Sequence, residues 1–179
     1  MKGAFFWLAL MLLLTGCAGS SGGKANVFVG EGHDAIRKVT VLPFKAPTEL
    51  IGASVSDLLT TELMKIGRYE LIERGQLSAV LGETEVSLSG LTAGQAAQLG
   101  KLVGANGVIV GTVSEYENVA QSGNTYPVVG VSARLIDSTS GRIIWSINKT
   151  GRGGSGETIS EYALEVVREM VASLKLQER

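Results

Sequence analysis

The sequence predicts a single α+β domain in which helices pack on a mixed sheet. Three observations support this prediction. Apolar residues recur at three- and four-residue intervals in 51–66 and 158–174, as on one face of a helix. Apolar and polar residues alternate in 128–137 and 142–150, as in strands with one buried face. The composition, with 24 glycines in 179 residues and few aromatic side chains, fits a tightly turned domain and argues against disorder.

The first seventeen residues have the pattern of a bacterial lipoprotein signal. Lys2 supplies a positive charge, an apolar run spans 4–14, and small residues precede Cys17. The run is shorter than the ~20 residues of a transmembrane helix. We therefore expect residues 1–16 to be removed and Cys17 to carry a diacylglycerol; an ordinary signal peptide with an incidental cysteine is the alternative. Three acyl chains would anchor the protein without spanning the membrane, and Ala18 after the cysteine favours the outer membrane over the inner.

The mature chain is expected to have two parts. Residues 17–35 are small and polar after Cys17 and predict a flexible tether, whereas 36–179 is long enough to bury one core. Cys17 is the only cysteine, so the domain has no disulfide and no cysteine-based site. The formal net charge of −1 gives no indication of nucleic-acid binding.

The elements of the domain are predicted in the order β-α-β-α-α-β-β-β-α. Gly67 ends the first long helix, and Thr92 with Gln95 and Thr158 with Glu161 form capping boxes at the starts of two later helices. The expected elements are a strand over 38–44, a helix over 51–66, a strand over 69–72, a helical turn over 76–81, a helix over 92–104, a strand over 108–116, a hairpin of 128–137 with 142–150, and a helix over 158–174.

His33 is the only histidine, and it lies beside Asp34 and near Glu31. These residue types could bind a metal or transfer a proton. However, the three residues fall in the predicted tether, where nothing would hold them in a precise geometry. We therefore interpret His33 as a solvated linker residue and expect no metal site.

The segment Gly151–Gly156 matches G-x-G-x-x-G between a strand and a helix, as in a dinucleotide-binding loop. That loop belongs in a parallel βαβ unit, whereas the preceding strand here is half of an antiparallel hairpin. We expect a flexible loop and no bound cofactor.

The remaining candidate surface comprises 45–49 with Arg74, where exposed ion pairs are the simpler expectation and an interface is the alternative. The acidic side chains are scattered over helix faces and strand ends, and no G-x-S-x-G motif is present. The sequence therefore predicts no catalytic residues and no enzyme.

Several segments resemble the curli-secretion lipoprotein family of the CsgG/HfaB type. The best of them is Arg68-Tyr69-Glu70-Leu71-Ile72-Glu73-Arg74-Gly75, which follows Val41-Leu42-Pro43-Phe44 and the first long helix. Similar runs are 104–113 and 133–145, so that the resemblance covers about 36–150. It implies an outer-membrane lipoprotein with a periplasmic domain of the anticodon-binding-domain-like fold. It also implies a relation to proteins that assemble as rings and secrete amyloid subunits through a shared β-barrel.

The sequence departs from the pore-forming members at two places. Each of their subunits adds two membrane hairpins, whose strands need ~9–11 residues each. At the corresponding positions this chain has only 117–127, polar and turn-like, and 151–157, rich in glycine. We therefore expect a short member of the family that lacks the membrane hairpins and is not itself a pore.

The expected function is protein–protein interaction in secretion or envelope assembly, with a homo-oligomer possible. The alternative is a lipoprotein that activates a penicillin-binding protein and so regulates peptidoglycan synthesis. Such activators reach through the cell wall on long tethers. Residues 18–35 would average only about 25 Å end to end and extend to at most ~60 Å, which disfavours this alternative.

Overall fold

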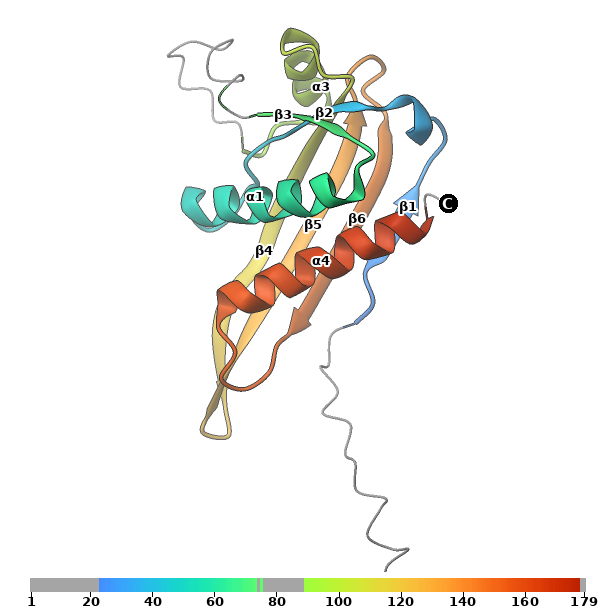
Figure 1. Ribbon diagram of the computed structural model, residues 1–179. Coiled ribbons are helices and arrows are strands. Elements are labelled where there is room, and N and C mark those ends of the chain that lie inside the picture. Colours follow the sequence, from blue (N-terminus) through green and yellow to red (C-terminus); the bar gives the residue numbers. More distant parts are fainter. Residues whose placement is uncertain (1–22, 74, 76–88, 178–179) are drawn as a thin grey trace, which may run out of the picture.

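One six-stranded mixed sheet forms the centre of the molecule, and helices lie on both of its faces (Figure 1). The computed structural model describes residues 23–73, 75 and 89–177. The strands follow the order β1-β6-β5-β4-β2-β3, in which β2 is parallel to both of its neighbours and all other pairs are antiparallel. The elements are β1 (Asn26–Val29), the 3-10 turn η1 (His33–Ala35), β2 (Lys38–Val41), α1 (Glu49–Ile66), β3 (Glu70–Ile72), α3 (Ala93–Leu102), β4 (Gly107–Gln121), β5 (Asn124–Asp137), β6 (Ile143–Arg152) and α4 (Ile159–Gln177).

The α+β fold with helices on a mixed sheet is confirmed, and the structure resolves which face each helix covers. The apolar stripes of α1 and α4 enter the same core, so both long helices lie on one face of the sheet. The shorter α3 lies on the opposite face over a smaller cluster. That cluster consists of Leu42, Ala96, Ala97, Leu99, Val108, Val110 and Ile136.

The helix ends follow the predicted chemistry. The Thr48 hydroxyl accepts a hydrogen bond from the Ile51 amide at the start of α1, and Gly67 ends that helix at a φ of +70°. The capping box of Thr92 and Gln95 is present. The same is true at α4, where Thr158 and Glu161 exchange backbone and side-chain hydrogen bonds.

The expected tether is partly folded. Residues 26–29 form β1, which pairs with β6 so that Asn26 lies opposite Asn148 and Val29 opposite Trp145. Val27 and Val29 pack against the main core, and η1 follows. A tether over 17–35 is therefore wrong from residue 26 onward, because this short segment gains its stability from a partner strand far away in the sequence.

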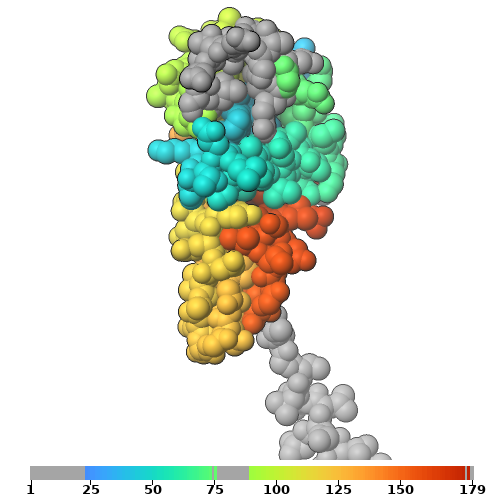
Figure 2. Space-filling view, turned by 90° about the vertical axis from the view of Figure 1, so that its left-hand side faces the viewer, coloured from blue at the N-terminus to red at the C-terminus, as the bar shows by residue number. Residues whose placement is uncertain are grey.

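The segment 117–127 is also different from the prediction. It continues the ladder of β4 and β5 up to the pair Gln121 and Asn124, with Ser122 and Gly123 forming a two-residue turn. Both turn residues have positive φ, 51° and 79°, as tight hairpin turns with the right twist require. Figures 1 and 2 show this hairpin extending past the helices, beside the first part of α4.

The helical turn expected over 76–81 lies outside the described residues. Within the described residues, no helix is long and apolar enough to cross a membrane.

Candidate interaction surface

The sheet face that carries α3 is only partly covered. Beyond the cluster under α3, none of the described helices covers this face of β1, β6, β5 and β4, because α1 and α4 pack on the opposite face. The side chains there come from paired positions, such as Thr112 opposite Ser132 and Arg134 opposite Ser146. We call this surface the open face; it consists of Phe28, Thr112, Ser132, Arg134, Ser146, Asn148 and Thr150.

The open face combines small polar groups with two larger side chains. Phe28 on β1 is 58% exposed, and its pairing partner Ser146 also faces Arg134 on the next strand. A monomer gains nothing from leaving a phenyl ring in water at this place, whereas a flat surface with one aromatic and one arginine side chain suits a protein contact. The open face is therefore the candidate interaction surface.

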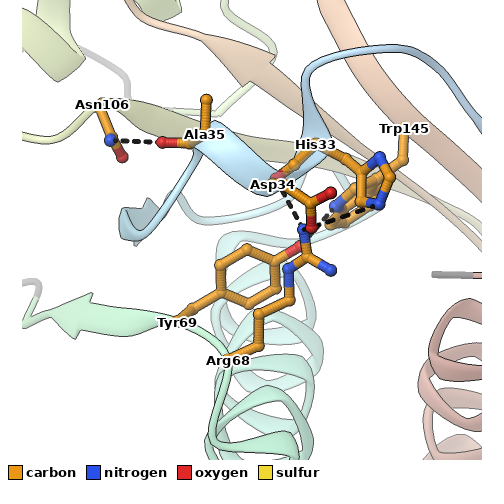
Figure 3. A network of polar contacts seen from close by, with 7 residues as sticks. All are labelled: His33, Asp34, Ala35, Arg68, Tyr69, Asn106 and Trp145. Carbon is orange, nitrogen blue, oxygen red and sulfur yellow. Dashed lines mark hydrogen bonds and ion pairs between the residues drawn. The ribbon is translucent and has the colours of Figure 1, made fainter. Parts of the chain in front are cut away.

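A polar network fastens η1 to the domain (Figure 3). The Arg68 guanidinium donates to the His33 carbonyl oxygen at 2.6 Å and lies 3.4 Å from an Asp34 carboxylate oxygen. It also lies over the Tyr69 ring, 5.4 Å from the ring centroid. Beneath it, the buried Trp145 indole N–H donates to the Tyr69 hydroxyl at 3.1 Å. These contacts fix η1 over the junction of α1 and β3.

Asn106 fastens the same segment from the other side. Its side-chain amide donates to the Ala35 carbonyl at 3.2 Å, and its Oδ1 accepts from the amides of Arg37 and Lys38 at 3.1 and 2.9 Å. One side chain thus satisfies three backbone groups where η1 leads into β2.

The residues that precede β1 are also held in contact with the domain. The Lys149 ammonium donates to the Gly23 carbonyl oxygen at 2.6 Å and pairs with Glu169 on α4. Only 2% of the Lys149 side chain is exposed, so this cation lies inside the domain. Gly23 is therefore held against β6 and α4, and the chain from Gly23 onward is part of the folded body.

His33 belongs to this fastened segment and is not a solvated linker residue. Its side chain is 24% exposed, with Nε2 at 3.5 Å from Asp34 Oδ1. The interpretation as a linker residue is wrong because Arg68 and the sheet hold η1 in place. In the described part of the chain, no three His, Cys, Asp or Glu side chains are grouped to hold a metal ion.

Backbone amides of the Gly-rich motif 151–156 form hydrogen bonds with other groups of the protein. The Gly153 amide donates to the Pro127 carbonyl at 2.9 Å, and the Gly154 amide donates to the Glu157 carboxylate at 2.9 Å. A Cβ on Gly153 would lie 2.8 Å from Pro127 Cγ and 2.9 Å from Tyr162 Cδ2, so packing against these two rings requires glycine at this position. The strand before the motif is antiparallel to its neighbours, unlike that of a dinucleotide-binding unit.

Of the candidate surface formed by 45–49 with Arg74, the structure describes only residues 45–49. Lys45 forms a parallel bridge with Thr112, and Thr48 caps α1. Arg74 lies outside the described residues, so an ion pair in this region stays a prediction. A pocket of about 370 Å³ lies between α1 and the strands β2 and β3, and it is lined by Val41, Asp57, Thr60, Leu71, Ile72, Glu73 and Gly75.

Two buried or turn carboxylates have lowered pKa values. For Glu62, burial opposes ionisation, but hydrogen bonds from Lys65 at 2.6 Å and Arg168 at 3.3 Å lower the pKa below its usual value. For Asp137, burial raises the pKa, but hydrogen bonds from Thr139 and Ser140 lower it by more, so that the pKa lies below its usual value. Both carboxylates stay charged at neutral pH and have structural partners.

The pKa of Tyr162 on α4 is raised rather than lowered. Burial, followed by the charges of Glu165, Glu169 and Glu157, raises the pKa of Tyr162 to about 12. Its hydroxyl is therefore neutral at neutral pH. None of these three shifts places a group near the pH at which general acid–base catalysis works.

Comparison with known proteins agrees with the resemblance seen in the sequence. The model of the curli production assembly/transport component CsgG matches residues 38–168. The chain belongs to the CsgG family. No curated protein matches the chain.

Several solved structures have a fold similar to that of this chain. PelC from Paraburkholderia phytofirmans, solved as a dodecamer, is 22% identical with a TM-score of 0.63, over 86% of this chain and 96% of PelC. Lipoprotein GNA1162 from Neisseria meningitidis is 20% identical with a TM-score of 0.59, over 78% of this chain and 99% of GNA1162. The LpoB C-terminal domain from Salmonella enterica is 23% identical with a TM-score of 0.51, over 72% of this chain and 88% of that domain. At these identities the likeness concerns the fold.

Sequence reasoning missed both the open face and the network around Arg68. The apolar alternation of β5 and β6 predicts which face is buried, but it does not predict that α3 covers only part of the other face. Asn26–Val29 has a faint alternation that could have indicated β1, and this strand places Phe28 on the open face.

Proposed function

We propose that this CsgG-family protein is an outer-membrane lipoprotein, anchored through Cys17 on the periplasmic side, that acts by protein–protein contact in secretion or envelope assembly. The observation that carries the proposal is the open face with its exposed Phe28 and Arg134. Family membership and the lipoprotein pattern of residues 1–17 support the same conclusion.

The contacts include contacts between copies of the chain. The PelC structures of similar fold are dodecamers, and an open sheet face bounded by the short edge strand β1 is suited to pairing with a neighbouring subunit. We do not assign a pore to the assembly. Beyond the end of β6, each strand of the β4–β5 hairpin has only four more residues, 118–121 and 124–127, compared with the ~9–11 that a membrane strand needs.

The reach of the anchor argues against activation of a distant penicillin-binding protein. Because Gly23 is held by Lys149, only six residue steps separate it from Cys17, which span at most about 21 Å. This is about a third of the ~60 Å that a tether over the whole of 18–35 could span. The domain therefore works close to its membrane.

Two measurements test the proposal. Cys17→Ser should abolish incorporation of labelled palmitate and remove the protein from the membrane fraction; continued fractionation of a processed Cys17→Ser protein with membranes would refute the anchor. Native mass spectrometry of the lipidated protein should give oligomers that Phe28→Asp or Arg134→Glu weakens. Leu50→Asp is the matched control, since Leu50 is 77% exposed on α1, on the other side of the sheet. Equal loss in the control, or no oligomer in any sample, would contradict a role of the open face in self-association.

A further inference from the structure

The first described residues lie at the end of the domain where the β4–β5 hairpin projects. β6 is antiparallel to both β1 and β5, so the start of β1 and the turn at Ser122 and Gly123 lie at the same end of the sheet (Figure 1). Asn26 pairs with Asn148, three residues before Gly151, and Lys149 binds the Gly23 carbonyl. Gly23 therefore lies near the row formed by Tyr116, Val129 and Gly151.

Two lengths at this end of the molecule agree. From the row of Tyr116 to Gln121, β4 continues for five residues, or about 17 Å beyond the level of Gly23. The chain from Gly23 back to Cys17 extends at most about 21 Å. The hairpin thus projects from the domain almost as far as the anchor can reach.

The hairpin tip, residues 118–128, has a composition that suits a lipid headgroup region. None of the residues 118–128 is itself charged, and the one charged group that the described contacts place on the tip is the guanidinium of Arg152 at the end of β6. Val119 is 38% exposed and lies opposite Tyr126 in the ladder. The Arg152 guanidinium lies over the Tyr126 ring, 4.6 Å from its centroid, and also donates to Gln121. Tyrosine and arginine are the side chains that favour the membrane–water interface and lipid phosphates.

We propose that the hairpin tip contacts the headgroups of the membrane that holds the anchor, and so sets the orientation of the domain. This inference rests on the proposed lipidation of Cys17. The tip does not insert across the bilayer; it acts as a second, peripheral contact next to the acyl chains. A domain fixed at both points would stand with its strands upright on the membrane. The open face would then point sideways, along the membrane surface, toward neighbouring anchored copies.

The experiment uses the lipidated full-length protein on vesicles of phosphatidylethanolamine and phosphatidylglycerol. Lipidation consumes the only native thiol, so a cysteine introduced by Val119→Cys can be labelled alone with an environment-sensitive fluorophore. Leu102→Cys is the matched control, because Leu102 is 65% exposed at the end of α3, at the opposite end of the sheet. Ala172→Cys, exposed on α4, reports a domain that lies on its helices.

On vesicles the probe at 119 should shift its emission to shorter wavelength and be quenched by lipids spin-labelled at the headgroup. The probes at 102 and 172 should show neither change. Inserting twelve Gly and Ser residues after Ser21 should keep the protein on the vesicles but abolish the signal at 119, because the longer chain no longer holds the tip at the surface.

Several outcomes would overturn the proposal. A probe at 119 that stays as water-exposed as the probe at 102, or quenching at 172 in place of 119, would show another orientation. An emission shift at 119 that is already present without vesicles would mean that another copy of the protein covers the tip. Loss of flotation with vesicles, with no palmitate on Cys17, would overturn the proposed anchor together with this inference, whereas flotation without a signal at 119 would overturn this inference alone.

Discussion

Lys149 on β6 and Glu169 on α4 form an ion pair of 2.5 Å in which the two partners differ in exposure. Only 2% of the Lys149 side chain is exposed, compared with 48% of the Glu169 side chain. Lys149 also donates to the Gly23 carbonyl. The buried partner therefore depends on the pair, whereas the exposed partner can be hydrated without it.

This asymmetry predicts that removing Glu169 costs more stability than removing Lys149. Glu169→Ala leaves a buried cation with one neutral acceptor, and we expect a loss of about 3 kcal/mol in the free energy of unfolding. Lys149→Met keeps the apolar stem and leaves a carboxylate that water can reach, with an expected loss of about 1 kcal/mol. Denaturant unfolding of the signal-less domain measures both.

The double variant is the control for this prediction. Once Lys149→Met is present, adding Glu169→Ala should cost little, because no buried charge is left without a partner. Equal losses for the two single variants, or strictly additive losses in the double variant, would show that the burial of Lys149 does not govern the energy of the pair.

Glu62 should make the stability of the domain depend on pH. Its pKa in the folded protein is lowered from the usual 4.5, so the unfolded chain binds the proton more readily. The stabilisation is therefore present above pH 4.5 and is lost as pH falls through the lower, folded pKa. Glu62→Gln should be less stable than the parent at pH 7, and the difference should shrink toward pH 3.

Arg168→Met tests the cause of this pH dependence. It removes the hydrogen bond that reaches Glu62 from α4, so the difference in unfolding free energy between pH 7 and pH 3 should become smaller than in the parent. If urea unfolding at the two pH values gives parallel losses for Glu62→Gln, the carboxylate of Glu62 contributes nothing through its charge.

The contact between α1 and α4 over the sheet should dominate the stability of the core. Leu63 and Val166 are both fully buried, and Leu63→Ala or Val166→Ala should each cost about 2–4 kcal/mol through lost burial and a cavity. Met64→Ala is the matched control, because Met64 is 63% exposed on the same helix and should change stability little. Denaturant unfolding that gives a loss below about half a kcal/mol for either buried site would contradict the position of these stripes.

The long helices could be predicted because the information is local. The spacing of Val55, Leu59 and Leu63 marks one face of α1, and Thr92 with Gln95 is a start signal that needs no tertiary partner. The alternation in β5 and β6 is similarly clear, because one face of each strand enters the core.

The elements that sequence reasoning missed depend on distant partners. β1 has four residues, and its partners on β6 are more than a hundred positions away. The end of the β4–β5 hairpin is a two-stranded ribbon exposed on most of its surface, so 117–121 shows no apolar alternation. The network of Arg68 with His33 and Asp34 likewise joins segments about 35 residues apart, which no local pattern encodes.

The last prediction is that the lipidated protein forms no conducting pore, even where it assembles into rings. Each strand of the β4–β5 hairpin extends only four residues past β6, about 13 Å, whereas the hydrocarbon core of a bilayer is about 30 Å thick. Glu117 at the base of the projecting part would enter the hydrocarbon region if the hairpin were pushed further in. Purified protein in planar bilayers should therefore give no stable conductance steps. Reproducible steps that vanish on deletion of 119–126 would show that the hairpin crosses the membrane in the assembly, and that this short member kept the secretion pore of its family.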